Sequence, residues 1–235
     1  MKTIGILGGL GPEATVDYYK EIIKQVSVIN NDGSLNYPEI VIYSVNMAEF
    51  ISMLEKGDFN KAIDYISDCI LKLANTGVDF TAISANTPHL FFKEIQSNVP
   101  IPLISIVETC KEKAKDMGLK RCGLFGTKFT MNATFFYDVF AKENIRVISP
   151  DENEIQRINN LLFTELEKGI FKKDTKTELL GMVSGMIERQ RIDSLILGCT
   201  EFPLMFDEEK YLGIPFLNTT RIHVAEIVKQ CLVID

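Results

Sequence analysis

Cys199 is the cysteine whose position in the sequence best suits chemistry. It follows an apolar run and is flanked by Gly198 and by the polar pair Thr200 and Glu201. A thiol at the carboxyl end of a strand lies next to the backbone amides that open the next helix, which predicts a pKa lowered from about 8.5 toward neutrality. The other four cysteines fall within helical patterns or open a buried strand, where cysteine is a small hydrophobe. We therefore predict that Cys199 is the functional thiol.

A second polar cluster, residues 85–89 with the sequence ANTPH, follows another apolar run. It supplies an amide from Asn86, a hydroxyl from Thr87 and an imidazole from His89. Because His89 follows a proline, we interpret it first as a helix-start residue with local hydrogen bonds. Its alternative role is that of a proton carrier.

These two clusters belong to an internal match. Residues 79–87 and 193–201 each have an acidic start, an apolar strand, a small residue and then polar residues followed closely by proline. Residues 5–8 and 123–126 form a second pair, at an offset of 118 positions against 114 for the first. The near-equal offsets favour a duplicated half. Because ligands of open α/β sheets bind beyond the carboxyl ends of the strands, we expect the polar clusters of two facing lobes to meet in one cleft.

Residues 8–15, with the sequence GGLGPEAT, form a glycine-rich segment between a strand and a helix pattern. Gly9, Gly11 and Ala14 match a loose dinucleotide fingerprint. Pro12 removes one amide that a pyrophosphate would need, and no P-loop lysine follows. We interpret the segment as a tight turn with Pro12 near the first helical position. The alternative is that this helix start binds a small carboxylate.

The elements that must position these residues alternate between strand and helix. The expected strands are mostly apolar throughout, as in parallel sheets covered on both faces: 3–7, 39–43, 79–83, 103–106, 122–125, 194–197 and 215–217. Amphipathic helical patterns lie between them, at 13–26, 58–75, 107–117, 133–142, 154–168 and 221–232. This alternation predicts an α/β fold with right-handed crossovers. We expect two pseudosymmetric lobes, each a mostly parallel sheet flanked by helices: residues 1–100 plus 213–235, and residues 101–212.

The composition and net charge of the chain exclude several classes of protein. The chain has 235 residues and a net charge of −7, without a long basic run, which argues against nucleic-acid or anionic-membrane partners. Its apolar stretches are too short to span a bilayer, and the N-terminus lacks signal-peptide features. The five cysteines form no CxxC pair and only two histidines occur, so neither a disulfide framework nor a metal site is expected. We predict a soluble, reduced, cytoplasmic protein.

The motifs together resemble the aspartate/glutamate racemase family. The resemblance rests on residues 5–15, on 85–89, on Gly126-Thr127 with Thr130, on 197–201, and on 218–223, in order along nearly the whole chain. It implies an amino-acid racemase that needs no cofactor, has two pseudosymmetric α/β lobes and forms a homodimer. In that family one cysteine from each lobe flanks the substrate α-carbon, one removing the α-proton and the other returning a proton to the opposite face.

The resemblance also implies which residues bind the substrate. An α-proton is weakly acidic, so hydrogen bonds to the substrate carboxylate must stabilise the carbanion. Residues at positions resembling the family's carboxylate-binding ones are Asn86, Thr87, Thr127 and Thr200, with Gly9 and Leu10 in the glycine-rich turn. Lys168 resembles the family's basic residue for a side-chain carboxylate; the alternative is a helix-end lysine that offsets the dipole.

Two positions depart from the family pattern. The family has a cysteine before Asn-Thr, where this chain has Ala85. Residues 44–49, near where aspartate-selective relatives carry a basic residue, contain no Lys or Arg, which argues against specificity for aspartate. Three hypotheses follow from Ala85. Cys199 serves one face while His89, Thr87 or a water serves the other; or Cys199 alone protonates a carbanion, as in decarboxylase-like relatives; or the protein only binds a small dicarboxylate. We favour a racemase that acts on a small amino acid through Cys199.

Overall fold

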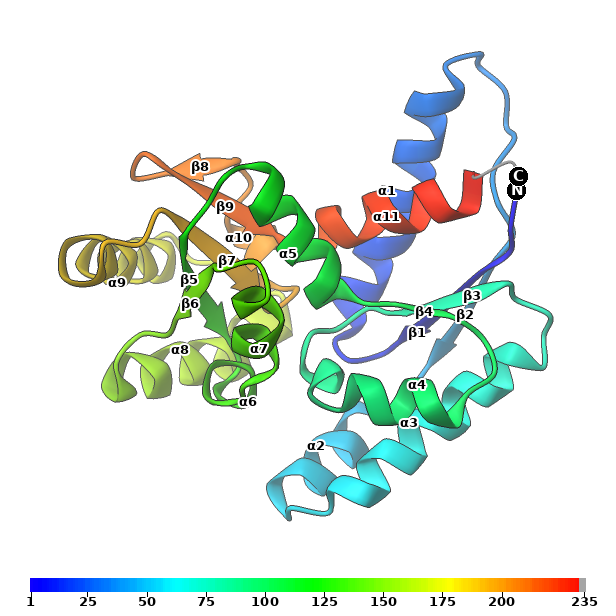
Figure 1. Ribbon diagram of the computed structural model, residues 1–235, viewed down its shortest axis with the longest axis horizontal. Helices are drawn as coiled ribbons and strands as arrows, with labels where there is room; N and C mark the ends of the chain where they lie inside the picture. Colours follow the sequence, from blue (N-terminus) through cyan, green and yellow to red (C-terminus); the bar gives the residue numbers. More distant parts are fainter. Residues whose placement is uncertain (233–235) are drawn as a thin grey trace. The chain divides into compact units, whose positions relative to one another are not determined.

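The computed structural model describes residues 1–232 and divides into two compact units, each built on its own sheet (Figure 1). The first unit contains Met1–Ile106 and the stretch from His223 onward, and the second contains Val107–Ile222. Over residues 1–232, no helix combines the length and the apolar character needed to cross a membrane. The α/β fold class predicted from the alternating strand and helix patterns is confirmed.

The first unit has a four-stranded parallel sheet in the order β2-β1-β3-β4. Its central strands β1 and β3 are entirely buried, which explains their largely apolar sequences. The elements of this unit are β1 (Ile4–Gly8), α1 (Pro12–Asn30), β2 (Ile40–Ser44), α2 (Met47–Glu55), α3 (Phe59–Ala74), β3 (Phe80–Ile83), η1 (Thr87–Phe91), α4 (Phe92–Asn98) and β4 (Leu103–Ile104).

Helix α11 (Thr219–Leu232) starts in the second unit and completes the core of the first. One buried cluster joins strands β1 and β3 to helices α1 and α11. Its members from α1 and α11 include Tyr18, Ile22, Val224 and Ile227. The backbone amide of Lys2 donates to the carbonyl of Cys231 over 3.0 Å, which ties the start of the sheet to this helix.

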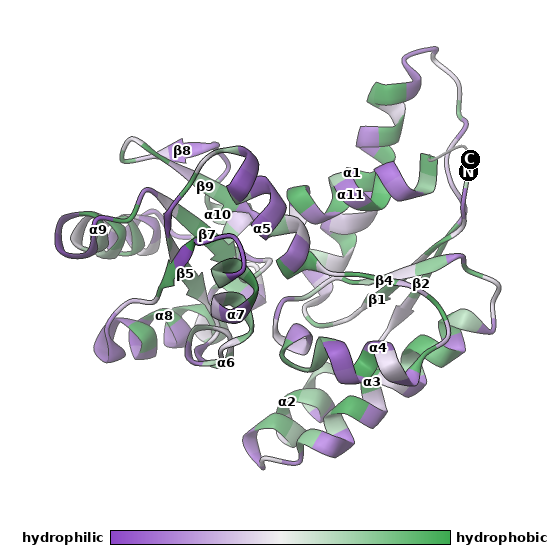
Figure 2. Cartoon of the chain, viewed as in Figure 1, coloured by the Kyte–Doolittle hydropathy of each residue, from purple (hydrophilic) through white to green (hydrophobic). Residues whose placement is uncertain are grey.

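The second unit has a five-stranded sheet in the order β6-β5-β7-β9-β8, parallel except for β8. Figure 2 shows the central strands β5 and β7 mostly in hydrophobic colours, and the edge strand β8 and helix α5 as largely hydrophilic. Its elements are α5 (Ile106–Asp116), β5 (Arg121–Gly126), α6 (Lys128–Asn132), α7 (Phe135–Ala141), β6 (Arg146–Ile148), α8 (Glu152–Thr164), η2 (Leu166–Lys168), α9 (Lys173–Gln190), β7 (Ser194–Gly198), α10 (Phe202–Met205), β8 (Lys210–Tyr211) and β9 (Ile214–Asn218).

The lobe boundaries differ from the expected ones at both crossings of the chain. Residues 101–106 lie in the first unit, because β4 pairs with β3. Residues 213–222 lie in the second unit rather than the first, because β9 pairs with β7. The expected boundaries were wrong because they assigned β4 and β9 to the other sheet. Strand pairing is a long-range property that local sequence does not encode.

The two sheets repeat one strand order and one register. In the first unit Ile4 pairs with Phe80, and in the second Cys122 pairs with Ser194, which are the residues at the matching offsets. The acidic residue that starts each repeat accepts a hydrogen bond from the equivalent backbone amide. The carboxylate of Asp79 accepts from the amide of Thr3 at 2.6 Å, and that of Asp193 accepts from the amide of Arg121 at 3.1 Å. The internal match in the sequence therefore corresponds to a repeated three-dimensional unit.

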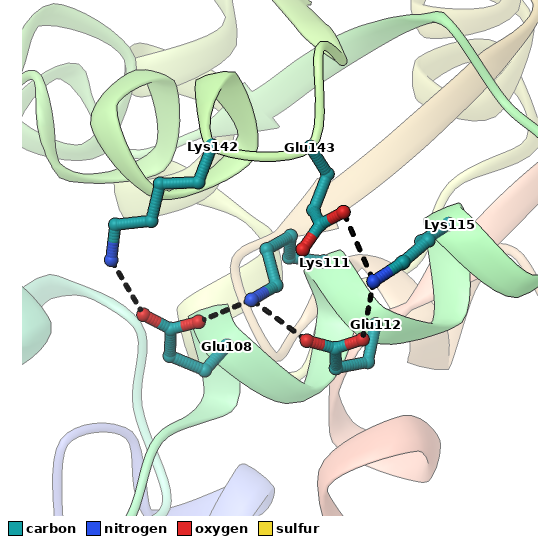
Figure 3. Close-up of polar contacts among 6 residues, drawn as sticks. All are labelled: Glu108, Lys111, Glu112, Lys115, Lys142 and Glu143. Atoms are coloured by element: carbon teal, nitrogen blue, oxygen red, sulfur yellow. Dashed lines mark hydrogen bonds and ion pairs between the residues drawn. The ribbon is translucent and has the colours of Figure 1, made fainter.

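An ion-pair network holds helix α5 to the end of helix α7 (Figure 3). The buried Lys111 ammonium lies 2.8 Å from a carboxylate oxygen of Glu108 and 2.8 Å from one of Glu112. More exposed pairs extend it, with Lys142 at 3.2 Å from Glu108 and Lys115 at 3.0 Å from Glu143. Burial makes Lys111 the most consequential member, because exposed pairs are screened by water.

We expect Lys111→Ala to lower the free energy of unfolding by about 1–3 kcal/mol, because the change leaves two carboxylates facing each other and removes a packed aliphatic stem. The half-exposed Lys115 serves as the matched control, and Lys115→Ala should cost below about 1 kcal/mol. Urea denaturation of both variants measures the difference. Equal losses for the two lysines would contradict the importance assigned to the buried member.

Candidate active site

Cys199 lies directly after strand β7, at the end of the sheet where the parallel strands terminate. Its residue is 6 % exposed. Gly198 before it lies against β5, where a Cβ atom would come within 2.8 Å of the carbonyl oxygen of Phe125. A glycine is therefore required for the close approach that sets the thiol at this end of the strand. Cys199 therefore lies directly after a buried strand, as the sequence predicted.

Two carboxyl groups approach the Cys199 thiol. The sulfur lies 2.9 Å from Oε2 of Glu201 and 3.9 Å from Oε1 of Glu167. Thr200 donates its hydroxyl to the same Glu201 oxygen over 3.2 Å. Glu201 is 1 % exposed, and Glu167, on the short helix η2, is partly exposed. Neither glutamate was among the predicted site residues.

A signal for Glu201 existed in the sequence, and one for Glu167 did not. Glu201 follows Cys199 and Thr200 directly at the end of an apolar strand, where an acidic side chain stays close to the thiol. Glu167 is 32 positions away from Cys199 and belongs to a polar stretch with several other acidic residues. Only the packing of η2 against the strand end selects it.

The protonation state of the Cys199 thiol differs from the one expected from the sequence, which was a lowered pKa. Burial, together with the charges of Glu201 and Glu167, raises the pKa of the Cys199 thiol well above its usual value. A backbone hydrogen bond at Glu201 acts in the expected lowering direction, but burial and the two carboxylates outweigh it. The expectation failed because the thiol is buried, and because two acidic side chains lie beside it. The resting group is a neutral thiol.

The pKa values of the two carboxyl groups are also raised. Burial, followed by the charge of Glu201, raises the pKa of Glu167 to about 8. Burial likewise raises the pKa of Glu201. A carboxyl group with a raised pKa is a stronger base than an ordinary glutamate, so this pair is better suited to exchange a proton with a thiol.

Ala85 is the internal counterpart of Cys199. Strand β3 pairs with β1 as β7 pairs with β5, and Leu7 with Ile83 matches Phe125 with Leu197. Two residues beyond Ile83 is Ala85, and two residues beyond Leu197 is Cys199. Ala85 is buried, with 4 % of its surface exposed. The position that carries a thiol in one unit therefore carries a methyl group in the other.

The predicted binding residues of the first unit gather at the same end of its sheet. Gly9 and Leu10 follow β1, and Asn86 and Thr87 follow its neighbour β3. Gly9 has φ +88°, and its amide donates to the hydroxyl of Thr15 over 2.9 Å. Helix α1 begins at Pro12, as the interpretation of the segment as a tight turn predicted.

The predicted residues of the second unit divide between the strand ends and helix η2. Thr127 follows β5 and caps α6, its Oγ1 accepting from the amide of Thr130 over 3.2 Å, while Thr200 follows Cys199. Lys168 ends η2, is exposed, and is adjacent in sequence to Glu167. The turn that carries a carboxyl group to the thiol thus also carries Lys168, whereas the helix predicted at 154–168 breaks after Thr164.

Comparison with known proteins agrees with this arrangement. Residues 7–227 match the family described as Asp/Glu/Hydantoin racemase. The chain belongs to the Asp/Glu/hydantoin racemase family. The broad specificity amino-acid racemase RacX of Bacillus subtilis (strain 168) is 29 % identical over 207 residues, which cover 87 % of each chain. The resemblance inferred from the motifs is therefore confirmed.

Solved structures of related proteins agree. An aspartate racemase homologue from Pyrococcus horikoshii OT3 is 31 % identical with a TM-score of 0.81, covering 98 % of this chain and 99 % of its own. The Picrophilus torridus aspartate racemase has a TM-score of 0.74 at 24 % identity, covering 98 % of this chain and 94 % of its own, and supports the fold alone. The two-sheet α/β architecture is thus that of the Asp/Glu/hydantoin racemase family.

His89, considered above as a proton carrier in this racemase-family chain, has both ring nitrogens engaged. The amide of Ile106 donates to Nε2 over 3.2 Å, so the proton of the neutral ring lies on Nδ1, 3.0 Å from the carbonyl oxygen of Ala85. Burial lowers the pKa of His89 to about 4. The ring is a structural link between the Ala85 loop and the start of helix α5.

His223 forms a parallel link. Its Nε2 lies 2.9 Å from the carbonyl oxygen of Ile104 and must donate to it, so Nδ1 accepts from the hydroxyl of Tyr18 at 2.9 Å. Burial, and next the nearby His89, lowers the pKa of His223 to about 3. The two imidazoles hold the backbone at Ile104 and Ile106, immediately before the second unit begins.

We expect this pair to make the protein sensitive to acid. Both imidazoles are neutral in the folded state and charge more easily when unfolded, near pH 6.5, so their stabilisation is complete above that pH and lost as pH falls toward about 4 and about 3. For His89 the loss at acidic pH is roughly 3 kcal/mol. Because the raised pKa values of Glu167 and Glu201 act in the opposite direction over the same pH range, the contribution of the imidazole is measured as the difference in urea midpoint between the wild type and a His89 variant from pH 7 to pH 5.

His89→Gln is the matched variant. It should be less stable at pH 7, yet its stability should depend less on pH by close to one proton, because the glutamine does not titrate. Identical pH slopes for the variant and the wild type would show that the imidazole is not neutral and buried as described.

Proposed function

We propose that this chain is an amino-acid racemase that needs no cofactor and moves the α-proton of a small amino acid with the thiol of Cys199. Membership of the Asp/Glu/hydantoin racemase family supports the reaction class. The observation that carries the assignment of the thiol is its contact with a buried carboxylate, 2.9 Å from Oε2 of Glu201. Among the five buried cysteines, Cys199 has this partner directly after a central parallel strand.

The proposed reaction begins with proton transfer from Cys199 to Glu201. The S–H proton moves to Oε2, and the thiolate then takes the α-proton of the substrate, which re-forms the S–H bond and leaves the electron pair on the α-carbon. Glu167, with its pKa raised to about 8, is protonated near neutral pH and holds a second exchangeable proton, and its Oε1 lies 3.9 Å from the sulfur. Return of a proton from solvent through this cluster gives exchange at one face.

Stabilisation of the carbanion is assigned to neutral donors. Asn86, Thr127 and Thr200 are buried side chains that follow central strands, and such preorganised donors strengthen as charge develops on the substrate carboxylate. We assign Lys168 to a carboxylate on the substrate side chain when one is present. The cleft in which the polar clusters of both lobes meet stays a prediction.

Ala85 makes the reaction asymmetric. Its methyl group cannot return a proton to the opposite face, and His89 is committed to Ala85 and Ile106 through both ring nitrogens. Of the groups considered for the second face, Thr87 and a bound water remain. We therefore propose that α-proton exchange is faster than inversion.

The same alanine favours a second candidate function. A member with a single thiol could protonate a carbanion generated in another way, as in decarboxylase-like or isomerase-like relatives. Binding of a small dicarboxylate without turnover is the third reading. Exchange of the α-proton separates the racemase from both, because neither alternative requires a labile amino-acid α-proton.

We further propose that the chain acts in the cytoplasm as a homodimer, without nucleic-acid or membrane partners. Its net charge of −7 supports the absence of an anionic partner, and five free cysteines are compatible with a reducing compartment. The dimer rests on the family resemblance.

Proton exchange tests the assigned thiol directly. Incubated in heavy water with a panel of L- and D-amino acids, the wild type should replace the α-hydrogen of its substrate by deuterium. Cys199→Ser should lower the exchange rate by at least about 100-fold, because a serine hydroxyl is a far weaker acid. Proton NMR of the α-hydrogen measures the loss. The control is Cys69→Ala, a buried cysteine of helix α3 far along the chain from the cluster. Equal exchange in Cys199→Ser and the wild type would rule out the proposed thiol.

Restoring the second thiol tests the asymmetry. Ala85→Cys should raise the rate of inversion relative to exchange by at least about tenfold, since it supplies an acid at the equivalent position of the other repeat. Polarimetry gives inversion, and NMR gives exchange on the same samples. No change in the ratio of the two rates would contradict the role assigned to Ala85.

A further inference from the structure

Cys199, Glu167 and Glu201 form a compact cluster of donor atoms in the second unit. The sulfur and one oxygen of each carboxylate all lie within 4.8 Å of one another. Around a tetrahedral zinc ion with bonds of about 2.0–2.3 Å, neighbouring ligand atoms lie about 3.5 Å apart. The sulfur is 2.9 Å from Glu201 and 3.9 Å from Glu167, so shifts of roughly an ångström would make the three atoms ligands of one ion.

The cluster contains a buried oxygen that lacks a hydrogen-bond partner. Oε2 of Glu201 contacts Cys199 and Thr200, but Oε1 of the same carboxylate has no partner among the described residues. Burial of such an oxygen costs free energy unless a cation or a donor contacts it. Within residues 1–232 no lysine, arginine or histidine forms an ion pair with Glu167 or Glu201. The cluster is therefore acidic and lacks a cation from the protein.

The donor types select the kind of ion. A sulfur ligand excludes the hard cations Mg²⁺ and Ca²⁺, which prefer oxygen alone. One sulfur and two carboxylate oxygens suit a borderline ion such as Zn²⁺, which also leaves a fourth tetrahedral position for water or substrate. We propose that Cys199, Glu167 and Glu201 form a binding site for a thiophilic divalent cation of the Zn²⁺ type.

Binding exchanges protons for the ion. The cation forms bonds to the sulfur and to one oxygen of each carboxyl group, while the S–H bond of Cys199 and the O–H bond of protonated Glu167 break and release both protons to solvent. Neither an oxidant nor a reductant is needed. The bound ion holds the sulfur lone pair that would otherwise take the α-proton. Inhibition of exchange follows, and this consequence rests on the proposed racemase function, whereas binding of the ion does not.

Cobalt(II) provides a spectroscopic test without substrate. Full-length protein, freed of metal by a chelator, is titrated with Co²⁺. One equivalent should produce a sulfur-to-cobalt charge-transfer absorption band, and Zn²⁺ should abolish it by displacement. Cys199→Ser should lack the band. Glu167→Gln and Glu201→Gln should weaken Co²⁺ binding by at least about tenfold, because each removes a charged ligand.

Glu165→Gln is the matched control. Glu165 lies two positions before Glu167, and its carboxylate accepts from Lys172 and Thr175 instead of approaching Cys199. This variant should bind Co²⁺ as the wild type does. Glu167→Gln keeps the test valid if Glu201→Gln fails to fold, since Glu167 is partly exposed on η2.

The possible outcomes test the proposed metal site independently of the proposed racemase reaction. A charge-transfer band that survives in Cys199→Ser, or its absence from the wild type, overturns the site. Equal Co²⁺ affinity in Glu167→Gln and Glu165→Gln also overturns it. A band in the wild type that is lost in Cys199→Ser supports the site even if no amino acid exchanges its α-proton, a result that would instead count against the racemase. If α-proton exchange is undiminished at saturating Zn²⁺, the proposed inhibition by the ion is wrong.

Discussion

Strand register is the constraint on which the candidate site depends. In each unit two central parallel strands end level with each other, Leu7 beside Ile83 and Phe125 beside Leu197. Every polar residue that follows these strands is placed by that alignment, because a shift by one residue would turn each side chain to the other face of the sheet. Glycines make the alignment possible: a Cβ atom on Gly198 would meet the Phe125 carbonyl oxygen at 2.8 Å.

The chemistry at the strand end comes from burial more than from partial charges on the backbone. The Cys199 thiol is enclosed with two carboxyl groups, and all three groups have raised pKa values. Each group therefore retains protons more strongly than it would in water. A cluster of this kind exchanges protons internally, and its charge state depends on any cation or donor that enters it.

The sequence predicted the parts of the fold that local patterns encode. Strands β1, β3, β5 and β7 are largely apolar, and the offsets between their motifs correctly indicated a repeated unit. Helix α9 was not predicted, because Gly181 and Gly185 interrupt a weakly amphipathic pattern. Strand β6 was also missed, since it has only three residues.

The candidate site, like the fold, was predictable where it depends on local sequence. The position of Cys199 follows from its place after an apolar strand. Its protonation state depends on burial, on Glu201 and on Glu167, and Glu167 lies 32 positions away in the sequence. The lobe boundary was misplaced at residues 213–222 for a similar reason, because the pairing of β9 with β7 is a long-range contact. Local sequence determined which elements form, and tertiary packing determined their neighbours.

The division of the chain has a consequence for its biosynthesis. The second unit is one continuous segment, Val107–Ile222, whereas the core of the first needs Val224, Ile227 and Val228 from helix α11. The segment that forms the second unit is translated before these three residues of α11 are added to the chain. The first sheet, although translated earlier, can be covered on the face that packs against α11 by α1 alone until α11 completes its core.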